Sequence, residues 1–330
     1  MNPINRHVLT GALILALALS AAGCRKADDT ADPEARKLTV FHAGSLSVPF
    51  KEIAEAFESE NPGVQVLLEA AGSRQCARKI ADLDRACDVM GSADYTVINE
   101  LLIPEHASWN IRFASNEMAI VYTDESLHAN ELDATNWHDI LMRPDVAFGR
   151  SDPNADPCGY RAILTMKLAE AHYAVPGLAE RMLAKDTKYI RPKETDLLAL
   201  LEAGEIDYIF LYRSVAQQHG LKYLLLPDAI NLKRSDLADA YSKASVEISG
   251  KTPGTTLTKR GAPMVYGITI PKNAPNPELA LEFVEFVLRK DKGMAVMERN
   301  GQPSVVPSPS DTFRMIPEPL KEFAAEAPGA

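Results

Sequence analysis

The sequence predicts an α/β protein in which largely parallel strands are flanked by helices. Short runs rich in branched and aromatic residues alternate with segments of helical period, which is typical of sheets covered by helices. Two of these units share a pattern, because an apolar strand runs into Ala43-Gly44-Ser45 and another into Ala71-Gly72-Ser73, each followed by a helix. The 330 residues are enough for two lobes.

The N-terminal residues indicate a signal peptide. A charged start precedes an apolar stretch, residues 9–19, that is too short for a comfortable membrane span. Small residues then lead to Cys24, as a lipoprotein signal peptidase requires, so we expect residues 1–23 to be removed and Cys24 to carry lipid. The alternative is a conventional signal peptide cleaved nearby. Residues 24–36 are small and charged and are expected to form a flexible tether.

Each Ala-Gly-Ser turn is expected to contribute to an anion-binding site. Glycine lets the backbone approach a ligand, and a helix start carries unpaired N–H groups and about half a positive charge. The hydroxyls of Ser45 and Ser73 would add two donors. The alternative is that each serine is an ordinary helix N-cap.

The remaining elements follow in alternation. Beyond the strands 38–42 and 64–68 and the helices after the two serines, strands are expected at 87–90, 117–122, 146–148, 207–212 and 264–270. Helices are expected from about Thr96, at 136–141, after the loop 151–160, around 197–201, from Ser214 and from Asn276, where Pro277 occupies the first helical position.

Charge and cysteine content restrict the function. A formal net charge of −10 argues against nucleic acid as a partner. With Cys24 lipidated, Cys76, Cys87 and Cys158 remain, and in an oxidising compartment a Cys76–Cys87 bridge is compatible with their spacing. No cysteine pair has the spacing of a zinc site and the seven histidines form no metal-binding motif, so no cofactor is expected.

Motifs spread over residues 37–308 carry a resemblance to one family. They are Phe41-His42-Ala43-Gly44-Ser45-Leu46, Glu69-Ala70-Ala71-Gly72-Ser73, Ala93-Asp94-Tyr95, Asp156-Pro157-Cys158-Gly159-Tyr160-Arg161, Asp207-Tyr208, Tyr212-Arg213-Ser214 and Tyr266-Gly267-Ile268-Thr269-Ile270-Pro271. In this order they resemble the tungstate- and molybdate-binding proteins of ABC importers, in the branch best known from archaea.

The resemblance implies a two-lobed periplasmic-binding-protein fold of type II, with a mixed sheet flanked by helices in each lobe. Lobe one would comprise residues 37–121 and 263–330 and lobe two residues 122–262, joined by hinge strands near 118–122 and 264–270. The implied protein is no enzyme. It would be a lipid-anchored, extracytoplasmic monomer that captures tungstate or molybdate between its lobes and delivers the oxyanion to a membrane permease.

The resemblance also implies the ligand contacts. In lobe one they are Gly44, Ser45 and Ser73, and in lobe two Asn154, Ala155, Asp156, Glu194 and Tyr212. Asp156 and Glu194 would coordinate the molybdenum or tungsten centre itself. Asp196 is a rival to Glu194, Asp156 could instead be an N-cap, and Tyr212 could instead be packed core.

The two acids make sense only as ligands of the metal centre. One carboxylate about 4 Å from a dianion, at an effective dielectric of about 20, repels it by roughly 8 kcal/mol in all. Charge-assisted hydrogen bonds of about 1.5 to 3 kcal/mol each could offset one such group but hardly two. Sulfate and phosphate, whose central atoms do not expand their coordination in this way, would meet only the repulsion.

Two other functions are compatible with the sequence. The cleft could bind another anion, such as sulfate, phosphate, a ferric complex or an organic anion. Alternatively, Ser45 or Ser73 could be the nucleophile of a hydrolase, although neither lies in a GxSxG motif and His42 lacks an evident orienting carboxylate. His42 is predicted to be a core or supporting histidine. The sequence does not determine whether tungstate or molybdate is preferred. It also does not identify the permease or the membrane that the lipid enters.

Overall fold

The computed structural model describes residues 36–327, all within one compact unit. The predicted signal peptide, Cys24 and the predicted tether up to residue 35 lie outside the described residues. Within 36–327, no helix has the length and apolar character needed to cross a bilayer.

The first of two five-stranded sheets is built from both ends of the described chain. Its strand order is β2 (Val64–Ala71), β1 (Arg36–Ala43), β3 (Val89–Ser92), β12 (Val265–Thr269) and β4 (Ile111–Ser115). The strands β2, β1 and β3 run parallel, whereas β12 runs antiparallel to its two neighbours. Because β1 and β2 are adjacent and parallel, their carboxyl ends meet at one edge of the sheet.

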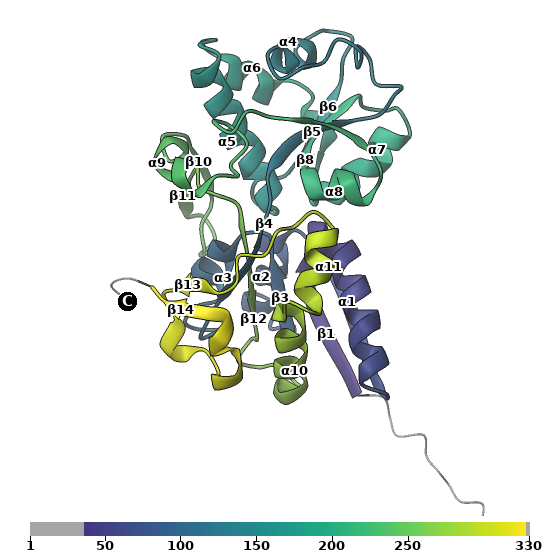
Figure 1. The fold of residues 1–330 in the computed structure, drawn as a ribbon. Coiled ribbons are helices and arrows are strands. Elements are labelled where there is room, and N and C mark those ends of the chain that lie inside the picture. Colours follow the sequence, from purple (N-terminus) through teal and green to yellow (C-terminus); the bar gives the residue numbers. More distant parts are fainter. Residues whose placement is uncertain (1–35, 328–330) are drawn as a thin grey trace, which may run out of the picture. The chain divides into compact units, whose positions relative to one another are not determined.

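Apolar helix faces cover this sheet. Its helices are α1 (Ser47–Glu60), α2 (Ser73–Ala81), α3 (Tyr95–Leu101), α10 (Pro277–Leu288) and α11 (Gly293–Arg299), grouped around β1, β3 and β12 in Figure 1. The helical period of α1 buries Phe50, Ile53 and Phe57. The Phe57 ring meets those of Phe283 and Phe286 edge to face at 5.2 and 5.4 Å, which joins α1 to α10.

The second sheet is formed by the middle of the chain. Its order is β7 (Ile190–Arg191), β6 (Phe148–Ser151), β8 (Tyr208–Tyr212), β5 (Met118–Tyr122) and β9 (Lys222–Leu225). Here β7, β6 and β8 are parallel, and β5 runs antiparallel to β8 and β9. The helices of this part are α4 (Trp137–Leu141), α5 (Pro157–His172), α6 (Leu178–Ala184), α7 (Leu198–Glu202) and α8 (Arg213–Gln218).

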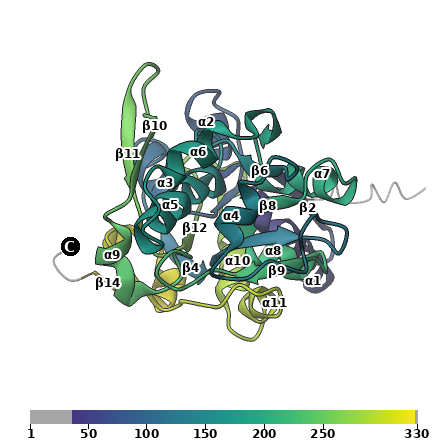
Figure 2. The same ribbon diagram turned by 90° about the horizontal axis from the view of Figure 1, so that it is seen from above.

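Shorter elements complete the described chain. The strands β10 (Ser245–Ser249) and β11 (Thr256–Arg260) pair antiparallel in a hairpin that extends away from the helices in Figure 2. The strands β13 (Ser308–Ser310) and β14 (Ala324–Glu326) pair in parallel. The remaining helices are α9 (Ala238–Tyr241) and the 3-10 turns η1 (Gly44–Leu46), η2 (Thr187–Tyr189), η3 (Glu194–Leu197), η4 (Ser235–Leu237), η5 (Phe313–Met315) and η6 (Glu318–Phe323).

The prediction of mixed sheets flanked by helices is confirmed. The division into lobes at 121/122 and 262/263 remains a prediction. The predicted hinge strands correspond to β5 in the second sheet and β12 in the first, and the boundary at residue 121 falls inside β5.

The Cys76–Cys87 bridge is not formed, since Cys76, Cys87 and Cys158 are all free and buried. The thiol of Cys76 instead lies 3.5 Å from the carbonyl oxygen of His42, to which it donates. Burial raises the pKa of Cys76 to about 12, so it stays a protonated, unreactive packing group.

Candidate functional site

The predicted contact residues lie at the ends of strands in both sheets. Gly44 and Ser45 form the turn η1 directly after β1, and Ser73 begins α2 one residue after β2. From the second sheet, Tyr212 is the last residue of β8. The loop between β6 and α5 contributes residues 154–156, and Glu194 begins η3 just after β7.

The backbone of two glycines lies close to atoms of the opposite side, which are side-chain atoms at Gly44 and backbone atoms at Gly72. A Cβ atom on Gly44 would lie 2.8 and 2.9 Å from the carboxylate oxygens of Glu194, and one on Gly72 would lie 2.4 Å from the carbonyl oxygen of Ala155. That same oxygen accepts a hydrogen bond from the amide of Gln75 at 3.2 Å. Gly72 therefore has no room for a side chain, because the backbone of the opposing loop lies against it, and at Gly44 a side chain would displace the carboxylate of Glu194.

Ser45 is held by a buried polar network. The hydroxyl of Tyr266 donates to Ser45 Oγ at 3.0 Å, and Asn116 Nδ2 donates to the Tyr266 hydroxyl at 2.9 Å. Gln302 Nε2 donates to the carbonyl oxygen of Ser45 at 2.9 Å. Ser45 is completely buried and makes no cap hydrogen bond to its helix.

Ser73 is also buried and is held by one peptide group. Its Oγ accepts from the amide of Ala93 at 2.9 Å, while Gly72 occupies the N-cap position of α2 without a side-chain cap bond. The alternative that Ser45 and Ser73 are ordinary N-caps is therefore wrong, because long-range partners occupy both hydroxyl oxygens.

Tyr212 belongs to the same group of buried hydroxyls. Its Oη accepts from Arg161 Nη1 at 2.9 Å, and burial raises the pKa of Tyr212 well above its ordinary range. Within residues 36–327, the hydroxyls of Ser45, Ser73 and Tyr212 each accept one hydrogen bond and donate none. Since a hydroxyl can donate as well as accept, each has its proton available for a ligand.

Asp156 and Glu194 lie side by side and are buried. Asp156 Oδ1 accepts from the amide of Cys158 at 3.1 Å, so Asp156 is the N-cap of α5. This capping role was the alternative predicted for Asp156. Its Oδ2 accepts from the amide of Glu194 at 3.0 Å. By contrast, neither side-chain oxygen of Glu194 has a hydrogen-bond partner among the described residues. Such orphaned, buried acceptors are costly unless a ligand or proton satisfies them.

The acid pair has perturbed protonation. Burial first, and then the adjacent carboxylate of Asp156, raise the pKa of Glu194 well above its ordinary value, although the nearby amides of Glu194 and Ser45 oppose this rise. Burial also raises the pKa of Asp156 against the effect of its hydrogen bonds. Perturbed acids of this kind are concentrated at functional sites.

The other candidates are placed differently. Asn154 is exposed, and its Oδ1 accepts from the amide of Ser249 at 2.8 Å, so its side chain is committed to the β10–β11 hairpin. Asp196 is exposed and pairs with Lys193 at 3.2 Å, whereas Glu194 is buried beside Asp156. His42 lies in the core against the ring of Phe50, and burial lowers its pKa to about 4.

Sequence reasoning assigned no role to Arg161 or Tyr266, although both lie inside quoted motifs. Their side chains hold the hydroxyls of Tyr212 and Ser45. The available signal was a charged side chain close to the predicted contact Asp156 for Arg161, and a phenolic side chain in a predicted hinge strand for Tyr266. This signal does not identify the hydrogen-bond partner of either residue. The partner of Tyr266, for example, is Ser45, which lies 221 positions away in the sequence.

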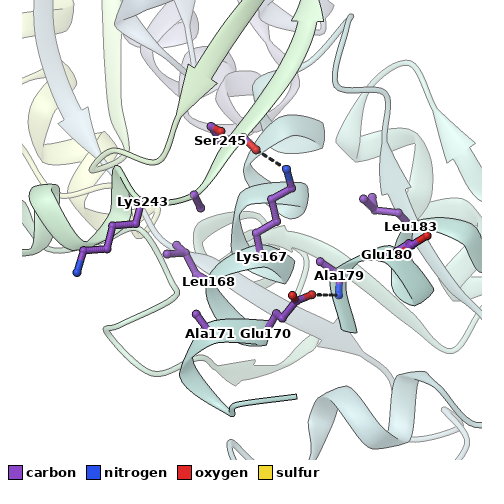
Figure 3. A pocket seen from close by; sticks show the side chains of 10 residues that line it. Lys167, Leu168, Glu170, Ala171, Ala179, Glu180, Leu183, Lys243 and Ser245 are labelled. Atoms are coloured by element: carbon purple, nitrogen blue, oxygen red, sulfur yellow. Dashed lines mark hydrogen bonds between the residues drawn. The ribbon is translucent and has the colours of Figure 1, made fainter. Parts of the chain in front are cut away.

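A separate cavity of about 510 Å³ lies away from these residues, between α5, α6 and the segment 243–245 (Figure 3). Two of its polar side chains are engaged within the protein, because Lys167 Nζ donates to the carbonyl oxygen of Ser245 at 2.5 Å and Glu170 accepts from the amide of Ala179 at 2.9 Å. None of the predicted ligand contacts lines this cavity.

Comparison with known proteins places these features in a wider context. The sequence model of a family described as "Bacterial extracellular solute-binding protein" matches residues 38–302. A protein of Petrotoga mobilis named as an uncharacterized solute-binding protein is 54% identical over 87% of this chain and 89% of its own. The molybdate/tungstate-binding protein WtpA of Thermococcus kodakarensis is 41% identical over 93% of this chain and 94% of its own.

A solved structure supports the fold. The periplasmic molybdate-binding protein of Azotobacter vinelandii matches with a TM-score of 0.58 at 14% sequence identity, over 80% of this chain and 98% of that chain. At this identity the likeness is one of fold, and it confirms the predicted periplasmic-binding-protein architecture.

Proposed function

Because this chain belongs to the family of bacterial extracellular solute-binding proteins, we propose that it captures molybdate or tungstate outside the cytoplasm and delivers the oxyanion to the permease of an ABC importer. The relative from Thermococcus kodakarensis, which is named for molybdate and tungstate, supports this ligand class.

The observation that carries the proposal is the pairing of unused donors with unused acceptors. Three buried hydroxyls, those of Ser45, Ser73 and Tyr212, have protons available for an oxyanion. Close to Gly44, the two side-chain oxygens of Glu194 have no partner among the described residues. Hydroxyl donors suit the oxo groups of any tetrahedral oxyanion, whereas carboxylate oxygens suit only its metal centre.

The carboxylates would provide selectivity. Molybdenum and tungsten in these oxyanions can accept further oxygen ligands, so Asp156 and Glu194 would bind the metal while the hydroxyls bind its oxo groups. Sulfate and phosphate would meet only the Coulomb repulsion, roughly 8 kcal/mol for one ionised carboxylate about 4 Å away. Because the cargo brings the metal with it, the protein would need no resident cofactor.

Lipidation at Cys24 would tether the mature, monomeric protein to a membrane. A ligand that contacts both sides of the site would favour a closed form, and the permease would recognise that form. We propose binding without turnover, because among residues 36–327 neither Ser45 nor Ser73 is hydrogen-bonded to a histidine.

Titration calorimetry on the purified chain tests the proposal directly. Molybdate and tungstate should bind with nanomolar dissociation constants, and sulfate and phosphate should give no comparable heat. Equal affinity for sulfate would contradict the proposed ligand class. Release of product from an activated ester by the same preparation would instead support the hydrolase alternative.

A further inference from the structure

The guanidinium of Arg161 connects two groups of the proposed ligand site. Arg161 lies in the second turn of α5 and is 3% exposed. Its Nη1 donates to the hydroxyl of Tyr212 at 2.9 Å and to the carbonyl oxygen of Ala93 at 2.8 Å. One nitrogen therefore joins the end of β8 in the second sheet to the segment that follows β3 in the first.

The peptide groups of Ala93 extend this connection to Ser73. The amide of Ala93 donates to Ser73 Oγ at 2.9 Å, and its carbonyl oxygen accepts from Arg161. Arg161 thus holds Tyr212 by a direct hydrogen bond. It holds Ser73 indirectly, through the backbone of Ala93. In both cases an N–H donor occupies the hydroxyl oxygen, which directs the hydroxyl proton away from that donor.

The charge of Arg161 is retained inside the protein. Its Nη2 lies 3.8 Å from Asp94 Oδ2, which also accepts from the hydroxyl of Tyr160 at 2.5 Å and lies 3.6 Å from Lys259 Nζ. Burial alone would raise the pKa of Asp94, but Lys259 and Arg161 hold it well below its ordinary range. Lys259 in turn pairs with the carboxylate of Glu100 at 2.7 Å, so Arg161 belongs to a buried network of charged side chains.

We propose that Arg161 is a positioning residue of the ligand site. It holds Tyr212, and through Ala93 also Ser73, so that both hydroxyls present their protons to the bound oxyanion. This inference rests on the proposed function, because it assumes that an oxyanion is the ligand. It predicts that the contribution of the Tyr212 hydroxyl to binding depends on the guanidinium of Arg161.

A double-mutant cycle measured by titration with molybdate tests this dependence. In the parent, Tyr212→Phe should weaken molybdate binding by about 10-fold, the value of one hydrogen bond to a charged group. In the Arg161→Lys background, which keeps the positive charge but loses the planar donor geometry, the same change should weaken binding by less than about 2-fold.

Two matched controls lie outside the site. Tyr208 is in the same strand as Tyr212, and its hydroxyl donates to the carbonyl oxygen of Leu127 at 2.5 Å. Arg112 lies over the ring of Tyr95 at 4.0 Å and pairs with Asp311 at 3.2 Å. Tyr208→Phe and Arg112→Lys should leave molybdate affinity unchanged and show no coupling.

The outcomes separate the two proposals. Losses that simply multiply in the double variant would overturn the positioning role, while the parent's molybdate binding would still support the proposed function. A parent that does not bind molybdate would overturn both. If thermal unfolding shows that Arg161→Lys does not fold, Arg161→Gln, which keeps an N–H donor, takes its place in the cycle and is judged by the same criterion.

Discussion

The two sides of the candidate site differ in charge and in how their polar atoms are used. On the side of the first sheet, Ser45 and Ser73 are neutral, and each has its oxygen engaged by a protein donor. On the side of the second sheet, Asp156 and Glu194 are adjacent acids, and both oxygens of Glu194 are unpartnered among the described residues. Hydroxyl donors serve every oxyanion equally, so under the proposed function the acids would provide the selection among oxyanions.

The largest expected effect follows from removing an acid. Asp156→Ala should weaken the binding of molybdate and tungstate by at least about 100-fold, because the loss of a mere outer-shell partner of a metal site already costs about 10- to 100-fold. Binding of sulfate should improve, because one repulsive charge is gone. Calorimetry with the four anions measures the ratio of the oxometalate and sulfate affinities.

A matched variant separates charge from helix capping in that experiment. Asp156→Asn keeps an oxygen that can accept from the amide of Cys158 and therefore preserves the N-cap of α5. It should lose oxometalate selectivity as Asp156→Ala does. If either folded variant discriminates tungstate from sulfate as well as the parent, the coordination role of Asp156 is wrong.

A second prediction concerns the stability of the ligand-free protein. Because burial and Asp156 raise the pKa of Glu194 above its ordinary value of 4.5, the folded state keeps this proton after the unfolded state has lost it. The stabilising contribution is complete below about pH 4.5 and is lost as the pH rises through the folded-state pKa. Glu194→Gln carries no titrating proton and escapes this loss.

Urea unfolding from pH 4 to pH 8 in ligand-free buffer measures this effect. The free energy of unfolding of Glu194→Gln minus that of the parent should increase with pH above pH 4.5, by up to about 1.4 kcal/mol per pH unit. Asp196→Asn, at the exposed neighbouring acid, is the control. Parallel curves for Glu194→Gln and the parent would show that Glu194 is ionised in the ligand-free fold.

The smallest effect is expected on the neutral side. Ser73→Ala removes one hydroxyl donor. It should weaken the binding of tungstate, molybdate and any weakly bound sulfate to the same extent, by about 10-fold. The ratio between their affinities should stay as in the parent, because no charge changes. A selective loss of tungstate alone would show that the two sides do not divide affinity and selectivity in this way.

The sequence was sufficient for features that depend on local pattern. The strand–turn–helix units around Ser45 and Ser73 have the predicted order, and Pro277 begins α10. The alternative that the two serines are N-caps is wrong, because their partners are Tyr266 and the amide of Ala93, which local pattern does not reveal.

The same limit applies to the acids and to Arg161. Glu194 and Asp196 lie two positions apart at the start of one turn, and their difference in burial arises from packing against Gly44 and Asp156. Arg161 lies in one of the motifs that carry the family resemblance, but its hydrogen-bond partners Ala93 and Tyr212 are distant in the chain.

X-ray absorption spectroscopy of the molybdate-bound protein tests the central claim most directly, because it reports the ligands around the metal itself. If Asp156 and Glu194 coordinate molybdenum, the spectrum should show six oxygen ligands, with longer bonds added to the four short oxo bonds, and Asp156→Ala should remove part of the longer shell. An undistorted tetrahedral spectrum with four equal oxygens in the parent would contradict coordination by the acids.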